Sequence, residues 1–257
     1  MTSIKEVFEN GEAFMPFTVG GYPDKEASKE VVQTLVDTGA DIIELGVPFS
    51  DPMADGPTIT EADMKALEND IDVDDVLEIA SEFPDTPIVL LAYANTVRRY
   101  GYKAFFEAAD QAGVNGLIVP DMPPQMYRDE IGDIETEVNQ IFLIGQNTPE
   151  ERFQEIGYMT EGFAYIVAVK GSTGTRGSFS EKTRNLMEKT EGLETPRCLG
   201  FGISQPEHAE KALEAEADGV IMGSAIIDAY KNNGIEGIES LASSISKSVN
   251  RENSKNE

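Results

Sequence analysis

Short apolar segments alternate with longer amphipathic segments along the whole chain. The apolar segments are rich in Val, Ile, Leu and Phe, a composition typical of β-strands, and the polar segments between them have helical character. The predicted strands are Ala13–Val19, Ile42–Gly46, Ile88–Ala92, Gly116–Val119, Gln140–Ile144, Phe163–Val169, Arg197–Phe201 and Gly219–Met222. The predicted helices between them include Asp24–Thr38, Lys103–Ala112, Pro149–Ile156 and Gln205–Glu214.

This alternation predicts an α/β fold with a parallel sheet. Eight such units in a chain of 257 residues favour closure into a (β/α)8 barrel, the TIM barrel. An open, doubly wound sheet is the main alternative, but no Gly-x-Gly-x-x-Gly turn follows the first predicted strand. Catalytic side chains of a barrel lie where strands end and loops begin, so the fold also predicts where to look for a site.

Two further helices are expected outside the eight units, at Ile4–Asn10 and at Gly237–Ser248. No low-complexity linker divides the chain, so residues 1–257 are predicted to form a single domain. The polar segment 251–257 is expected to be a frayed tail.

The charge is strongly unbalanced, with 47 acidic and 20 basic residues and a formal net charge of -27. Such a chain repels nucleic acids and anionic membranes, so neither is an expected partner. The charge indicates a halophile, expected to be archaeal, because concentrated salt screens the self-repulsion. An ordinary acidic enzyme with solvated carboxylates is the alternative.

Cellular location is suggested by what the sequence lacks. Cys198 is the only cysteine, which excludes an intramolecular disulfide. The N-terminal segment does not resemble a signal peptide, and no apolar run has the length of a membrane span. We therefore expect a soluble, cytoplasmic protein.

Two acidic residues stand out near the second predicted strand. Strand side chains alternate between faces, so Ile43 and Leu45 are expected to face the helices while Ile42 and Glu44 face the barrel axis. A buried glutamate has a raised pKa, which suits general acid–base catalysis. Asp55 follows on a proline-rich loop that could hold it opposite Glu44. The structural alternatives are a buried salt bridge for Glu44 and a helix N-cap for Asp55.

Glycine-bearing strand ends recur late in the chain. Gly200–Ser204 and Gly223-Ser224 follow the seventh and eighth predicted strands. Many barrels bind phosphate at these two places with backbone N–H groups and a helix N-terminus. The alternative is that the glycines only mark turns.

The segment from Glu44 to Pro57, ELGVPFSDPMADGP, closely resembles the signature of the tryptophan synthase alpha chains. Further segments resemble that family in the same order along nearly the whole chain: Pro16–Pro23, Tyr93–Asn95, Pro120–Pro123, Gly171–Gly174, Gly200–Ser204 and Gly223–Ile226. The resemblance implies a lyase that cleaves indole-3-glycerol phosphate to indole and glyceraldehyde 3-phosphate, with no metal or cofactor in this chain.

By its matching positions, the resemblance implies that Glu44 and Asp55 are the catalytic residues. It assigns substrate binding to Phe17, Leu91, Tyr165, Thr173, Gly174, Gly202, Gly223 and Ser224. It also implies a partner, a beta chain that carries pyridoxal phosphate, in an α2β2 tetramer. The loops after the second and third strands, Asn95 and Pro120 are the expected contact surface.

Two alternatives to this lyase remain open. Lys170 stands in the sixth loop where the family more often has a small residue, and Ala168 where serine is common. A Schiff-base aldolase that uses Lys170 is therefore a second hypothesis, and a non-catalytic barrel that regulates a beta chain is a third.

The only histidine, His208, is interpreted as a surface residue, and the acidic run Asp70–Asp75 as a solvated face.

Overall fold

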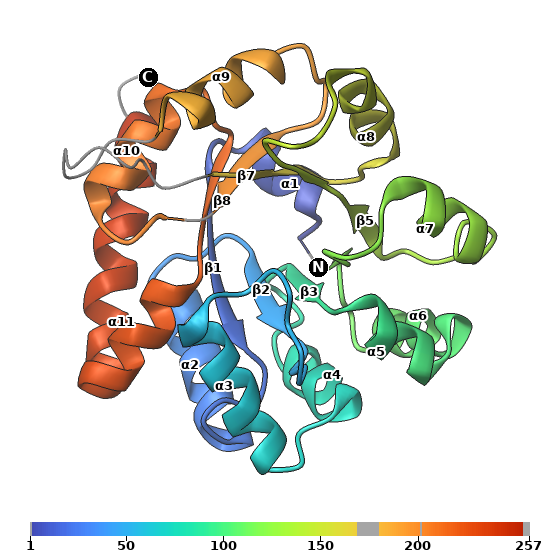
Figure 1. The fold of residues 1–257 in the computed structure, drawn as a ribbon. Coiled ribbons are helices and arrows are strands. Elements are labelled where there is room, and N and C mark those ends of the chain that lie inside the picture. The colour runs from blue at the N-terminus through green and yellow to red at the C-terminus, as the bar shows by residue number, and fades with distance from the viewer. Residues whose placement is uncertain (1, 169–179, 201, 254–257) are drawn as a thin grey trace.

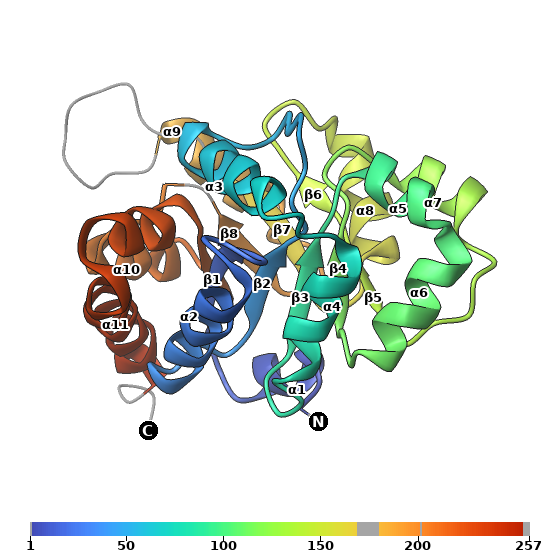
Figure 2. The same cartoon turned by 90° about the horizontal axis from the view of Figure 1, so that it is seen from below.

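The strands form a barrel. In the computed structural model, which describes residues 2–168, 180–200 and 202–253, neighbouring strands pair in parallel in the order β5-β4-β3-β2-β1-β9-β8-β7-β6. β5 (Asn139–Ile141) and β6 (Leu143–Ile144) stand at opposite ends of this order, yet only Phe142 separates them in the chain. They are two halves of one strand, so the sheet curls back on itself, and the helices surround it (Figures 1 and 2).

Each of the strands β1 to β4 and β6 to β9 is followed by one or two helices, as expected of an α/β barrel. The strands are β1 (Ala13–Val19), β2 (Ile43–Gly46), β3 (Ile88–Leu91), β4 (Gly116–Ile118), β7 (Ala164–Val167), β8 (Arg197–Gly200) and β9 (Gly219–Met222). The helices are α1 (Ile4–Glu9), α2 (Lys25–Asp37), α3 (Pro57–Glu68), α4 (Val73–Ser81), α5 (Ala94–Tyr100), α6 (Tyr102–Gln111), α7 (Pro124–Glu130), α8 (Phe153–Met159, preceded by the 3-10 turn η1, Glu150–Arg152), α9 (Glu181–Lys189), α10 (Pro206–Glu214) and α11 (Ser224–Asn253).

The predicted barrel is confirmed, with differences at a few element ends. The fifth predicted strand is divided at Phe142. The predicted terminal helix Gly237–Ser248 is part of α11, which begins directly after β9 and changes direction at Gly234 (φ 61°, ψ -148°). Residues 251–253, expected to be frayed, are helical. Val169 and Phe201, predicted strand ends, lie outside the described residues.

The core has two layers because strand side chains alternate between the barrel interior and the helices. The interior cluster contains Ala13, Met15, Ile42, Val89, Ile118, Ile141, Phe163, Tyr165, Cys198 and Ile221. Ile43 and Leu45 belong to the outer layer under the helices, as predicted. Burial of each such aliphatic side chain contributes about 1.5–3 kcal/mol, which stabilises the strand ends that carry the site.

The amino end of the barrel is covered by α1. Ser3 and Glu6 form a capping box at its start, and Ile4 is buried against Gly116 and Gly162. The opposite end, where the strands terminate, is left open for a site. Of the helices in the described ranges, none has the length and apolar character needed to cross a membrane.

Candidate active site

A pocket of about 600 Å³ opens at the carboxyl ends of the strands. Eight of the ten predicted site residues line it: Phe17, Glu44, Asp55, Leu91, Tyr165, Gly202, Gly223 and Ser224. The remaining two, Thr173 and Gly174, lie outside the described residues. Residues more than 200 positions apart in the sequence thus meet in one cavity at the end of the barrel where the fold predicts a site.

Glu44 extends from the middle of β2 into the pocket and is only 4% exposed. Burial, together with the nearby negative charge of Asp55, raises the pKa of Glu44 to about 8. No lysine or arginine among the described residues contributes to this shift, so the salt-bridge alternative finds no partner there. At neutral pH the Glu44 carboxyl group is therefore protonated and able to donate a proton.

Asp55 is held over the pocket by a tyrosine. The hydroxyl group of Tyr93 donates a hydrogen bond to Asp55 Oδ2 (2.7 Å) and accepts one from the backbone N–H of Ala54 (3.0 Å). Burial raises the pKa of Asp55, and the Tyr93 hydrogen bond opposes that rise. Gly56, not Asp55, is the N-cap of α3, so the capping alternative for Asp55 is wrong.

Asp63 is a third buried carboxyl group and is not among the predicted site residues. It lies on α3, is 4% exposed, and accepts a hydrogen bond from the backbone N–H of Phe49. Burial and, secondarily, the charge of Asp55 raise the pKa of Asp63 to about 8. The ring of Phe49 stacks on Tyr93, with 4.8 Å between the ring centroids. Asp63 and Tyr93 therefore hold the loop between β2 and α3 from two sides.

The sequence does contain a signal for Asp63, namely its position on the apolar face of a helix. Ala62, Asp63 and Ala66 share the buried face of α3, so one charged residue interrupts an otherwise apolar helix face. For Tyr93 the sequence indicates only a position directly after the third predicted strand. Nothing in the sequence indicated that its hydroxyl group would reach a residue 38 positions earlier.

Apolar side chains form the middle of the pocket. Phe17 lies in β1, Leu91 is the last residue of β3, and Tyr165 of β7 belongs to the cluster in the barrel interior. Tyr165 is buried against Gly200, where any Cβ atom would overlap its ring. A flat aromatic substrate group fits between such walls, and the carboxyl groups of Glu44 and Asp55 line the same cavity.

Part of the pocket, which we call its backbone end, is formed by Gly202, Gly223 and Ser224. Gly202 has φ +86°, a conformation that favours glycine. Gly223 and Ser224 precede and begin α11, whose first N–H groups have no helical partner. Backbone donors and the positive end of a helix dipole suit an anion such as a phosphate.

An acidic residue also lies at this end of the pocket. Asp228, in the second turn of α11, lines the cavity, and its Oδ1 accepts a hydrogen bond from Thr58 Oγ1 (3.2 Å). The ionisable side chains with a carboxyl group that line the pocket are Glu44, Asp55 and Asp228, and no basic side chain lines it within the part of the chain that the structure describes. Lys170, the basis of the Schiff-base hypothesis, lies outside it.

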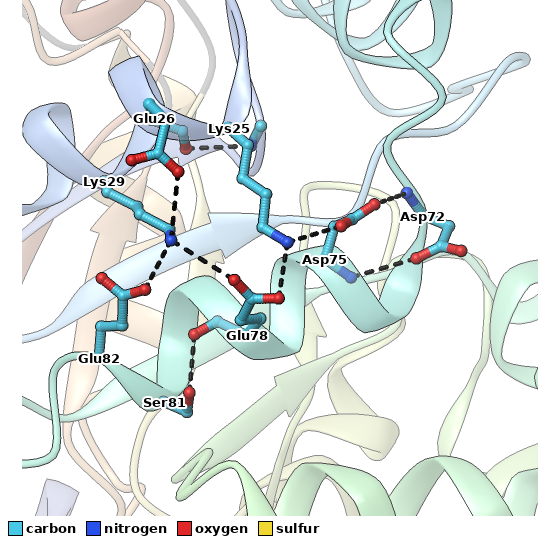
Figure 3. A network of polar contacts seen from close by, with 10 residues as sticks. Lys25, Glu26, Lys29, Asp72, Asp75, Glu78, Ser81 and Glu82 are labelled. Carbon is cyan, nitrogen blue, oxygen red and sulfur yellow. Dashed lines mark hydrogen bonds and ion pairs between the residues drawn. The ribbon is translucent and has the colours of Figure 1, made fainter.

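The remaining predicted features lie away from the pocket. His208 Nδ1 accepts a hydrogen bond from the backbone N–H of Ser204 (3.2 Å). The acidic run 70–75 is more than a solvated face: Asp72 caps α4, and Asp75 pairs with Lys25 (2.7 Å). Figure 3 shows how Lys25 and Lys29 of α2 join the acidic residues of α4. No group of His, Cys, Asp and Glu in the described ranges has the arrangement of a metal site.

Comparison with known proteins gives consistent results. Residues 4–256 match the family model described as tryptophan synthase alpha chain. The tryptophan synthase alpha chain of Methanothermobacter thermautotrophicus is 42% identical over 239 residues, which cover 90% of this chain and 88% of that protein. The one from Haloferax volcanii is 36% identical over 237 residues, covering 88% and 84%. A solved tryptophan synthase from M. tuberculosis has a TM-score of 0.88 at 32% identity, covering 97% and 99%.

These similarities do not favour a particular source. Identity to the Haloferax chain is lower than identity to the Methanothermobacter chain. The comparisons therefore do not support the prediction of a halophile, which rests on the net charge alone.

Proposed function

The chain belongs to the tryptophan synthase alpha chain family, and from that premise we propose that Glu44 and Asp55 are its catalytic residues. The alpha subunit is an indole-3-glycerol-phosphate lyase that needs no cofactor, since pyridoxal phosphate resides in the beta chain. The observation that carries the proposal is that both carboxyl groups line one pocket and that burial raises the pKa of each.

Glu44 moves the proton. The bond between C3 of indole and the glycerol chain breaks only after C3 is protonated, because an indole carbanion is a poor leaving group. Protonated Glu44 donates to C3, and the resulting carboxylate then accepts the proton of the adjacent hydroxyl group. The C–C bond electrons return to the indole ring as the aldehyde forms. Glu44 ends the step protonated, as it began.

Asp55 stabilises charge. Protonation at C3 places positive charge on the ring nitrogen, and an ionised Asp55 accepts a hydrogen bond from N1–H. The hydrogen bond from Tyr93 supports this role because it favours the ionised form of Asp55. Phe17, Leu91 and Tyr165 pack against the indole ring and the glycerol chain.

The substrate phosphate lies at the backbone end of the pocket, against Gly202, Gly223 and Ser224. The resemblance also assigns Thr173 and Gly174 of the sixth loop to substrate binding, and both lie outside the described residues. Exclusion of water from the reacting atoms would strengthen the interaction between Asp55 and the ring nitrogen.

A beta chain is the proposed partner, in an α2β2 tetramer that works in the cytoplasm. Solved structures of tryptophan synthase have the same fold as this chain, which is consistent with such a partnership. The loop between β2 and α3 is a suitable contact surface, since Met53 is 90% exposed there. Asn95 and Pro120 lie at neighbouring strand ends and extend this surface.

Replacement of the two carboxyl groups tests the proposal. Glu44→Gln is expected to lower kcat for indole release by about 10²–10⁴-fold, because the amide cannot carry the proton. Asp55→Asn is expected to lower kcat by about 10²–10³-fold through loss of charge stabilisation. Asp51→Asn is the matched control, since it removes an exposed carboxyl group from the same loop and keeps activity.

Full activity of Glu44→Gln would contradict the mechanism. Reductive trapping with borohydride addresses the Schiff-base alternative, because substrate-dependent labelling of Lys170 would assign the reaction to an imine. An unaltered chain that binds a beta chain but releases no indole would instead support the non-catalytic barrel.

A further inference from the structure

The phosphate end of the pocket has an unusual charge for a site that holds a phosphate ester. Asp228 lies one helical turn after Ser224 on α11, so both residues lie near the same face of the helix. No lysine or arginine lines the pocket within residues 2–168, 180–200 and 202–253. Backbone N–H groups and the helix dipole are then the positive groups near the phosphate in this part of the chain.

A carboxylate at this position weakens the attraction of the backbone N–H groups and the helix dipole for the substrate phosphate. A helix N-terminus carries about half of a positive charge, while a phosphate monoester carries about -1.5 to -2 at neutral pH. Asp228 places a full negative charge within the first two turns of the same helix. It offsets the dipole and repels the phosphate directly, and the net charge of -27 adds a repulsive field around the whole molecule.

We propose that Asp228 sets the salt dependence of substrate binding, by repelling the substrate phosphate unless dissolved cations screen the two charges. The inference rests on the phosphate position proposed above. In a phosphate pocket lined by lysine or arginine, added salt weakens substrate binding because it screens an attraction. In this chain added salt screens the repulsion between Asp228 and the substrate phosphate, so it strengthens substrate binding.

A purely structural role for Asp228 makes different predictions. Thr58 donates to Asp228 and Lys231 pairs with Glu61, so two contacts join α11 to α3, the helix that follows Asp55. If Asp228 served only as this tether, loss of the Thr58 hydroxyl group would have the same effect as loss of the Asp228 charge.

Three variants distinguish the effect of the Asp228 charge from the effect of the hydrogen bond between Thr58 and Asp228. Asp228→Asn removes the charge but keeps an oxygen that can accept the Thr58 hydrogen bond. Thr58→Val removes the hydrogen bond and keeps the charge. Glu239→Gln is the matched control, because it removes one exposed carboxyl group from the distant half of α11. KM for indole-3-glycerol phosphate is measured from about 0.05 M to about 1 M KCl, with circular dichroism to verify folding at each concentration.

The unaltered chain is expected to show a KM that falls as KCl rises. Asp228→Asn is expected to have an about fivefold lower KM at the lowest salt concentration, with the difference vanishing near 1 M. Glu239→Gln and Thr58→Val are expected to keep the salt dependence of the unaltered chain.

Equal KM values for Asp228→Asn and the unaltered chain at low salt would overturn the inference. So would a salt-independent rise in KM common to Asp228→Asn and Thr58→Val, which would assign Asp228 to the tether. Absence of lyase activity in the unaltered chain would count against the proposed function rather than against the role of Asp228.

Discussion

At the scale of single residues, two similar carboxyl groups are given opposite roles by their surroundings. Glu44 is buried in the barrel wall, and its pKa is raised to about 8, which keeps it protonated at neutral pH. Asp55 receives a hydrogen bond from Tyr93 that favours the ionised form. One group can therefore donate a proton while the other stabilises positive charge, a division that depends on environment and not on residue type.

Tyr93→Phe tests this division. The substitution keeps the ring that stacks on Phe49 but removes the hydroxyl group that donates to Asp55. The pKa of Asp55 should then rise, because its ionised form loses a hydrogen bond. We expect kcat/KM to fall by about tenfold at neutral pH and its acid limb to move to higher pH. An acid limb at the same pH as in the unaltered chain would show that Tyr93 does not act through Asp55.

At the scale of elements, α3 connects the catalytic loop to the barrel. Gly56 and Pro57 begin the helix directly after Asp55. Asp63, six residues after Pro57, accepts a hydrogen bond from the backbone N–H of Phe49 near the start of the same loop. The loop between β2 and α3 is thus tied at both ends to one helix. This arrangement buries the Asp63 carboxyl group close to Asp55, which disfavours the ionised form of Asp63.

Asp63→Asn is expected to remove the unfavourable ionisation of a buried carboxyl group. The hydrogen bond from the backbone N–H of Phe49 is kept, because the amide oxygen can accept it. The pKa of Asp63 is higher in the folded chain than in the unfolded chain, so its contribution to stability is present below about pH 4 and is lost as pH rises toward 8. The variant should therefore gain stability over the unaltered chain between these pH values, by at least ~1 kcal/mol at pH 8.5 relative to pH 4.5.

Urea unfolding of both proteins at the two pH values measures this difference. Contributions from the carboxyl groups that do not interact with Asp63 cancel, since both proteins contain them; Asp55, whose charge acts on Asp63, is the exception. A difference in unfolding free energy that does not change with pH would mean that Asp63 titrates normally in the folded chain.

The sequence predicts elements better than it predicts the contacts between them. Alternation in β2 was sufficient to place Glu44 inside and Ile43 and Leu45 outside, because strand geometry is local. The partners of Asp55 could not be predicted in this way, since Tyr93 belongs to another strand and depends on how the barrel closes. The division of the fifth strand at Phe142 has the same origin: one half pairs with β4 and the other with β7.

At the scale of the whole molecule, negative charge dominates. Even where lysines are present, as in the α2–α4 network of Figure 3, they are outnumbered: Lys29 is within 4 Å of Glu26, Glu78 and Glu82. Such ion pairs contribute little at an exposed surface and weaken in salt. Self-repulsion among the excess carboxylates is therefore expected to control how stability responds to salt.

We expect the midpoint of thermal unfolding at neutral pH to rise by about 5–10 °C between about 0.1 M and about 2 M KCl, because screening reduces that repulsion. The rise should be smaller at mildly acidic pH, where the carboxyl groups are partly protonated. Differential scanning calorimetry measures both. A midpoint that falls with added salt would favour an ordinary acidic enzyme held together by its ion pairs.

The pH dependence of kcat/KM for indole release tests whether protonated Glu44 starts the reaction while ionised Asp55 supports it. We expect a bell-shaped profile whose alkaline limb falls about tenfold per pH unit above a pKa near 8, the value for Glu44. A kcat/KM that stays constant up to about pH 10 would contradict it.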